Sequence, residues 1–152
     1  EQQSRDTTKR KLSFHDSQIE TYTNGPRAHS LAHIGAGNPP RKKENQDVVQ
    51  YHGNYGPTGD YVVTFCIDGH GKHGKTVAEK IAEFTTDHLY DYIKDCPAEG
   101  DDKSWTNALT KLFKDMHKYL MQHQEVGFRG RMSGATVTLI VVYCGILHCA
   151  NV

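Results

Sequence analysis

A short apolar run that ends in a carboxylate and an imidazole constrains this chain more than any other feature. Residues 61–67 (YVVTFCI) are rich in β-branched and aromatic side chains, which predicts a buried strand. Asp68, Gly69, His70 and Gly71 follow directly. An aspartate offers a hard oxygen to a cation, a histidine offers a proton near neutral pH, and glycines allow tight turns. The pattern therefore indicates a metal-assisted reaction at the end of this strand.

A second carboxylate is predicted to lie beside the first. Residues 47–51 (DVVQY) read as another strand, and residues 52–59 form a turn segment with three glycines and a proline. An antiparallel hairpin places the start of its first strand beside the end of its second, so Asp47 and Asp68 should converge. Two close carboxylates are costly unless a cation or a proton lies between them. Two separately solvated loop aspartates are the alternative.

The rest of the chain predicts two helices and a second hairpin. Apolar residues recur at helical spacing over residues 76–94 and 104–123, with Ser104 as a plausible N-cap. Residues 135–143 and 146–152 read as strands joined by a tight turn. Strands followed by helices and strands again favour an α+β fold, with helices stacked on an antiparallel or mixed sheet.

Length and charge limit the organisation and the partners. The 152 residues suit one domain, with a polar, flexible arm over residues 1–28 and the folded part over residues 29–152. The chain is predicted to stop inside its last strand, as a fragment would. Lys and Arg number 18, as do Asp and Glu, so no overall field attracts nucleic acid or an anionic membrane. We expect a monomer with neither partner.

Cysteine usage indicates a reducing compartment. The four cysteines fall in or beside apolar stretches and form no CxxC pair; they are Cys66, Cys96, Cys144 and Cys149. We expect reduced and mostly buried thiols, which are typical of cytoplasmic or nuclear proteins.

A phosphate-binding loop is the main rival to the metal hypothesis. Residues 69–76 (GHGKHGKT) fit the pattern G-x-x-x-x-G-K-[ST] between a predicted strand and a predicted helix. A nucleotide-binding fold of this kind needs parallel β-α-β units and a second apolar strand that ends in aspartate. Residues 137–142 are followed by Tyr-Cys-Gly, and the first hairpin is predicted to be antiparallel, so this reading is disfavoured.

Four segments together resemble the metal-dependent type 2C Ser/Thr protein phosphatases. They are residues 44–47 (ENQD), 68–71 (DGHG), 133–138 (SGATVT) and 147–152 (LHCANV). The resemblance runs from about residue 30 to the end and covers the N-terminal part of that catalytic domain. It implies an α-β-β-α four-layer sandwich of antiparallel sheets flanked by helices. It also implies two Mg²⁺ or Mn²⁺ ions, whose bridging hydroxide attacks phosphoserine or phosphothreonine in protein substrates.

The same resemblance implies roles for individual residues. Asp68 would bridge the two ions, and the carbonyl of Gly69 would ligate one of them. Asp47 would hold a metal ion or its water. His70 would be the general acid, because a departing serine alkoxide needs a proton.

Three departures from the family pattern leave an alternative open. Gln46 stands where many members have Glu, so one anionic metal ligand becomes a neutral amide. The phosphate-gripping position is Lys42, with Arg41 one step earlier, and either could serve. Further aspartates that complete the family's metal site lie beyond the end of this chain, so the chain alone should bind metal weakly and be inactive. A non-catalytic, phosphatase-like partner-binding module is therefore the second hypothesis.

Overall fold

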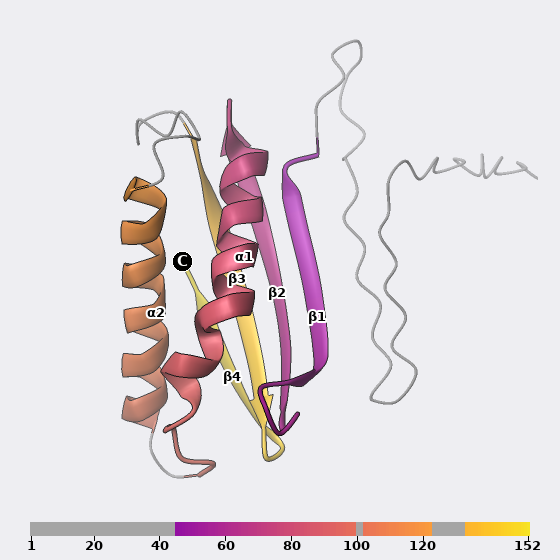
Figure 1. The fold of residues 1–152 in the computed structure, drawn as a ribbon, viewed down its shortest axis with the longest axis vertical. Helices are drawn as coiled ribbons and strands as arrows, with labels where there is room; N and C mark the ends of the chain where they lie inside the picture. Colours follow the sequence, from indigo (N-terminus) through magenta and orange to yellow (C-terminus); the bar gives the residue numbers. More distant parts are fainter. Residues whose placement is uncertain (1–44, 100–101, 123–132) are drawn as a thin grey trace, which may run out of the picture.

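A four-stranded sheet with two helices on one face forms the described part of the chain. The computed structural model describes residues 45–99, 102–122 and 133–152 (Figure 1). Its strands are β1 (Asp47–Tyr55), β2 (Tyr61–Gly71), β3 (Ser133–Tyr143) and β4 (Ile146–Asn151), and its helices are α1 (Gly74–Ile93) and α2 (Asp102–Gln122). The strands lie in the order β1-β2-β3-β4 and every neighbouring pair is antiparallel. The predicted α+β class and antiparallel pairing are confirmed.

Several element boundaries differ from the predictions. β1 continues to Tyr55 because residues beyond position 51 still pair with β2, with a shift in register between His52 and Tyr55. β2 continues to Gly71 because β3 pairs with it as far as Ser133. The Asp68–Gly71 segment is thus strand rather than the loop that follows one. α2 begins at Asp102, so Ser104 lies in its first turn and its prediction as the N-cap was wrong.

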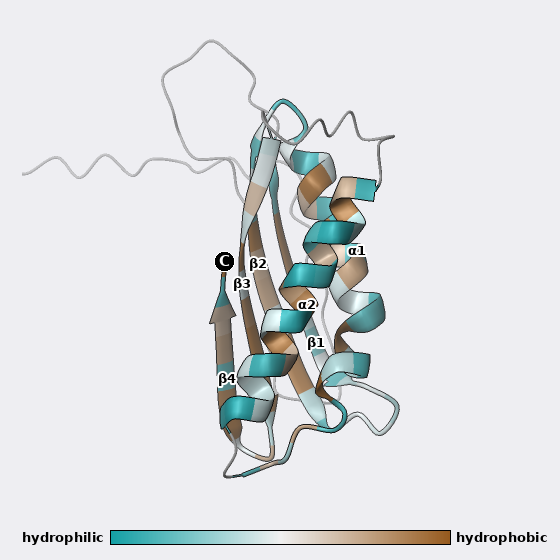
Figure 2. Cartoon of the chain, turned by 90° about the vertical axis from the view of Figure 1, so that its left-hand side faces the viewer, coloured by the Kyte–Doolittle hydropathy of each residue, from teal (hydrophilic) through white to brown (hydrophobic). Residues whose placement is uncertain are grey.

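The core lies between the sheet and the helices, as the brown bands of Figure 2 show. Every second residue of β2 and β3 points into it: Tyr61, Val63, Phe65, Ile67, Val137, Leu139 and Val141. Among the described residues, the opposite face of the sheet carries no helix (Figure 2). Because strand side chains alternate between faces, Cys66, Asp68 and His70 are exposed on that open face.

The same alternation corrects the prediction of mostly buried thiols. All four cysteines are free, but only Cys96 is buried. Cys66 and Cys149 are exposed on their strands, and Cys144 is exposed in the β3–β4 turn. Cys144 and Gly145 both have positive φ values, 49° and 80°, as a tight two-residue hairpin turn requires. A cysteine within or beside an apolar run is therefore exposed when it lies on the open face of the sheet or in a turn.

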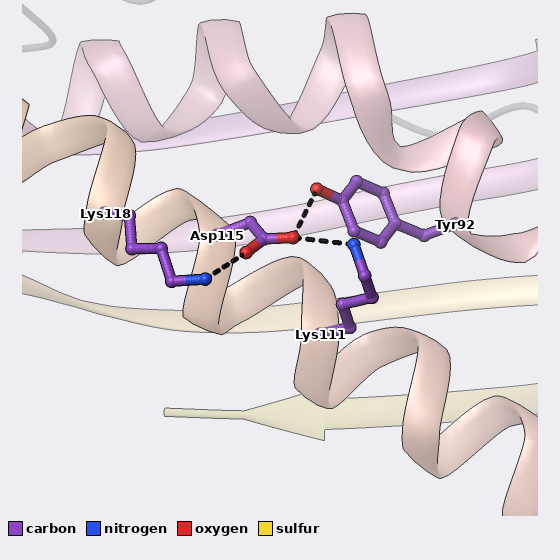
Figure 3. A network of polar contacts seen from close by, with 4 residues as sticks. All are labelled: Tyr92, Lys111, Asp115 and Lys118. Carbon is purple, nitrogen blue, oxygen red and sulfur yellow. Dashed lines mark hydrogen bonds and ion pairs between the residues drawn. The ribbon is translucent and has the colours of Figure 1, made fainter.

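A small polar network joins the two helices at the molecular surface (Figure 3). The Tyr92 hydroxyl on α1 donates to Asp115 on α2 at 3.1 Å. Lys111 and Lys118 approach the same carboxylate at 2.8 and 2.9 Å. Hydrogen bonds from Lys111 and Lys118 hold the pKa of the Asp115 carboxyl below its usual range. None of the described helices is both long and apolar enough to cross a membrane.

A tyrosine of β1 is inserted into the hydrogen-bond ladder of α1. The Tyr55 hydroxyl donates to the carbonyl of Thr86 at 2.9 Å and accepts from the backbone N–H of Tyr90 at 3.1 Å. Thr86 and Tyr90 are four residues apart, so they are the groups that an uninterrupted α-helix pairs with each other. A side chain inserted in this way bends a helix and ties it to its neighbour.

We expect Tyr55→Phe to destabilise the protein by only about 1 kcal/mol. The freed Thr86 and Tyr90 groups can bond to each other, which limits the loss. Urea unfolding followed by circular dichroism measures this effect. Tyr90→Phe is the matched control, because the Tyr90 hydroxyl makes no hydrogen bond within the described part of the chain. Equal losses in the two variants would contradict the role given to the Tyr55 hydroxyl.

Candidate active site

Two aspartates face each other at the end of the β1–β2 ladder. Asp47 and Asp68 are direct partners in the antiparallel register, so their side chains lie next to each other on the same face of the sheet. Burial and then the charge of Asp68 raise the pKa of the Asp47 carboxyl. The predicted convergence is confirmed, and the alternative of two separate loop aspartates does not hold. Such a pair calls for a shared proton or a bound cation.

This pair should make the metal-free protein less stable as the pH rises. The pKa of Asp47 is above its ordinary value of 3.8, so the folded state binds more protons than the unfolded state just above that pH. The contribution of Asp47 to the free energy of unfolding must then fall as pH rises through this window, whereas the lowered pKa of Asp115 gives a contribution of opposite sign that Asp68→Asn leaves in place. Urea titrations between about pH 3 and pH 6 measure the fall. Asp68→Asn should reduce it, and an unchanged slope would show that Asp68 does not contribute.

Gly69 allows the end of β2 to pass between β1 and the start of α1. Its N–H donates to the carbonyl of Gln46 at 3.2 Å. A Cβ atom at Gly69 would lie 2.4 Å from the Gly74 oxygen and 2.6 Å from the Gln46 oxygen, and real side chains do not approach so closely. The chain therefore needs glycine here, and the backbone beside Asp68 is held closely on two sides.

His70 lies on the open face beside Asp68, across from Gly134 of β3. The two are direct partners in the β2–β3 register. A Cβ atom at Gly134 would lie 2.8 Å from Nε2 of His70, so the imidazole lies against the bare backbone of β3. Gly134 belongs to one of the segments that resemble the phosphatase family, but only the structure shows that it lies against the His70 ring.

Two polar side chains hold the residues around His70, and sequence analysis missed both contacts. The Gln46 amide nitrogen donates to the carbonyl of Gly71 at 2.9 Å. The Ser133 hydroxyl accepts from the backbone N–H of His73 at 2.9 Å. Gln46 lies immediately before β1, which begins at Asp47. The predicted role of Gln46 as a metal ligand stays a prediction.

The segment that matched a phosphate-binding loop does not form one. Gly69 to Gly71 belong to β2 and pair with β3, and α1 begins at Gly74. Only Lys72 and His73 connect the strand to the helix, too few to wrap around phosphates. Both neighbours of β2 are antiparallel to it. This geometry opposes the nucleotide-binding alternative.

The described residues supply part of a metal site. Within residues 45–99, 102–122 and 133–152, no three His, Cys, Asp or Glu side chains are grouped closely enough to hold an ion. Asp47, Asp68 and the Gly69 carbonyl offer the hard oxygen donors that Mg²⁺ and Mn²⁺ prefer. They fit such an ion as an incomplete ligand set. Arg41 and Lys42, predicted to grip phosphate, lie outside the described residues.

The chain is similar to two rice proteins (Oryza sativa subsp. japonica) named as phosphatases. It is 29% identical over 112 residues to "Probable protein phosphatase 2C 64", across 74% of this chain and 26% of that protein. It is 31% identical over 80 residues to "Probable protein phosphatase 2C 75", across 52% of this chain and 18% of that protein. The matches thus span about a quarter or less of these relatives. No protein-family model matches the chain.

Proposed function

We propose that the complete protein carrying this chain is a metal-dependent protein Ser/Thr phosphatase. This chain would supply the N-terminal part of an α-β-β-α sandwich domain, of which the described residues form one sheet and one helical layer. The observation that carries the proposal is the pairing of Asp47 with Asp68 in the strand register, next to Gly69 and His70 at one end of a hairpin. The similarity to two proteins named phosphatase 2C supports it.

Each site residue would contribute one part of the chemistry. Asp47, Asp68 and the Gly69 carbonyl would hold Mg²⁺ or Mn²⁺, which relieves the repulsion between the two carboxylates. Such ions, when bound, neutralise phosphate oxygens and activate water for attack. His70 is exposed beside this pair and would donate a proton to the departing serine or threonine oxygen.

A positively charged side chain that precedes β1 in the sequence would bind the phosphate group of the substrate. Either Arg41 or Lys42 could serve, Arg with a bidentate fork and Lys as a point charge. The substrates would be phosphoserine and phosphothreonine proteins, because His70 can assist the departure of an alkoxide of either residue.

A phosphatase-like binding module without activity is the second candidate. Gln46 favours it, because its amide nitrogen is bonded to Gly71 and the residue brings no negative charge to a metal. Such a module would keep the fold but would turn over no phosphoester.

Hydrolysis assays on the complete protein separate the two candidates. The substrates are p-nitrophenyl phosphate and a phosphothreonine peptide, each with Mn²⁺ or with EDTA. A phosphatase should show turnover that EDTA removes, and Lys75→Ala should leave this turnover unchanged, because Lys75 is exposed on α1 and has no role in the proposed site. The absence of turnover from a folded complete protein with Mn²⁺ would favour the binding module.

A further inference from the structure

The end of β2 extends beyond the end of its β1 partner. The β1–β2 register ends at Asp47 and Asp68, followed by one backbone bond from Gly69 to Gln46. On the other side, β3 pairs with β2 as far as Gly71. The side chain of Asn45 accepts from the N–H of Asp47 at 3.0 Å, an Asx-type bond that favours a turn before β1. The carbonyl of Gly71 therefore lies past the last backbone bond of the β1–β2 ladder.

The side chain of Gln46 supplies a donor for this carbonyl. Its amide nitrogen bonds the Gly71 oxygen at 2.9 Å. Its amide oxygen lies against the first residue of α1, since a Cβ atom at Gly74 would be 2.6 Å from it. One side chain thus extends the β1–β2 ladder and contacts the start of the helix.

Ser133 holds the same segment from the other neighbouring strand. Its hydroxyl accepts from the N–H of His73, the residue immediately before α1. These two bonds fix Gly71 and His73, and His70 is the residue immediately before Gly71. The backbone that carries the Gly69 carbonyl and the His70 imidazole therefore leads directly into a segment that is fixed at Gly71 and at His73.

We propose that Gln46 is a positioning residue that holds the Gly69 carbonyl and the His70 imidazole in place through its bond to Gly71, rather than a metal ligand. The inference rests on the proposed phosphatase function. The positioning role requires an amide at position 46, because an ionised carboxylate of the same shape has no hydrogen to donate to a carbonyl. The two roles for Gln46 predict opposite effects for a charged substitution.

The test compares Gln46→Glu with Gln46→Met in the 152-residue chain. Both substitutions remove the donor and nearly keep the length of the side chain, but only Glu adds a charge. If Gln46 holds Gly71, both should speed amide hydrogen exchange at Gly69 and His73 by roughly threefold to tenfold, the effect of one lost hydrogen bond. Both should also weaken Mn²⁺ binding severalfold, measured by paramagnetic broadening of the NMR signals of Asp68 and His70.

Direct ligation would give a different ranking of the variants. Gln46→Glu would then bind Mn²⁺ more tightly than the wild type, Gln46→Met would bind it more weakly, and exchange at Gly69 and His73 would not change. That result overturns the proposal. The same pair of substitutions at the exposed Gln122, at the end of α2, controls for general effects of Glu and Met.

The exchange measurement separates this proposal from the proposed function. Unchanged amide exchange in both variants overturns the positioning role of Gln46, regardless of the effect of the substitutions on Mn²⁺ binding. A complete wild-type protein whose Asp68 and His70 signals are not broadened by Mn²⁺ counts against the metal function, and faster exchange in both variants would still support the contact with Gly71.

Discussion

Replacing Asp68 by asparagine is expected to abolish Mn²⁺-dependent turnover in the complete protein and to stabilise the metal-free fold. Asp68 would hold the metal directly, and even indirect supporting groups at metal sites are worth 10- to 100-fold, so we expect a loss of at least roughly a hundredfold. The substitution also removes one charge from a directly opposed pair in which the charge of Asp68 raises the pKa of Asp47. Like charges opposite each other across two strands destabilise a sheet by roughly 0.2–1 kcal/mol, so the metal-free variant should gain about that much.

Activity with Mn²⁺ and urea unfolding with EDTA measure the two effects on the same samples. Asp60→Asn is the matched control, because Asp60 is exposed next to the start of β2, at the opposite end of the β1–β2 hairpin. It should change neither quantity. Retention of Mn²⁺-dependent turnover by Asp68→Asn would contradict the proposed site. Loss of activity together with reduced stability would show instead that Asp68 is needed for the fold.

Gly69→Ala is expected to have the largest effect on folding of any single methyl group added to the site. The new Cβ atom would meet two backbone oxygens, those of Gly74 and Gln46, at 2.4 and 2.6 Å. Backbone at a helix start and next to a strand cannot move aside as a flexible side chain can. Overpacking typically costs 1–3 kcal/mol, and we expect roughly 3 kcal/mol or more here. Thermal and urea unfolding measure the loss.

Gly134→Ala is the matched comparison, because its Cβ atom would meet a side chain instead. The nearest atoms belong to the His70 imidazole, at 2.8 and 2.9 Å, and this exposed ring can rotate away. Stability should fall much less than in Gly69→Ala, while turnover by the complete protein should fall because the proposed acid is displaced. Equal destabilisation by the two substitutions would contradict the argument that backbone contacts, rather than loss of glycine itself, control the cost.

The meeting of Asp47 and Asp68 could be predicted from local patterns. Two β-prone runs separated by a Gly- and Pro-containing segment predict an antiparallel hairpin, and antiparallel pairing brings the start of one strand to the end of the other. The helical spacing of apolar residues likewise placed α1 and α2 to within a few residues. These features depend on periodicity and on chain direction, both of which are properties of the sequence alone.

Other features depended on partners distant in the chain. β2 continues through Gly71 because β3, some 60 residues later, pairs with it to Ser133, and no local signal at Gly71 shows this. Cys66 and Cys149 are exposed because an apolar strand in this sheet has only one face against the helices. Local hydrophobicity predicts a strand, but it does not show which face will be covered.

The sequence by itself determined the α+β class, the antiparallel hairpin and the pairing of two carboxylates beside a histidine, because strand and helix periods and turn residues act over short range. Only the tertiary structure decided that Gln46 bonds Gly71, that Gly134 lies against the His70 ring and that Gly69 is enclosed by backbone. These contacts depend on how β1, β3 and α1 pack around the end of β2, and a few tenths of an ångström in that packing decide whether a hydrogen bond forms or a methyl group fits.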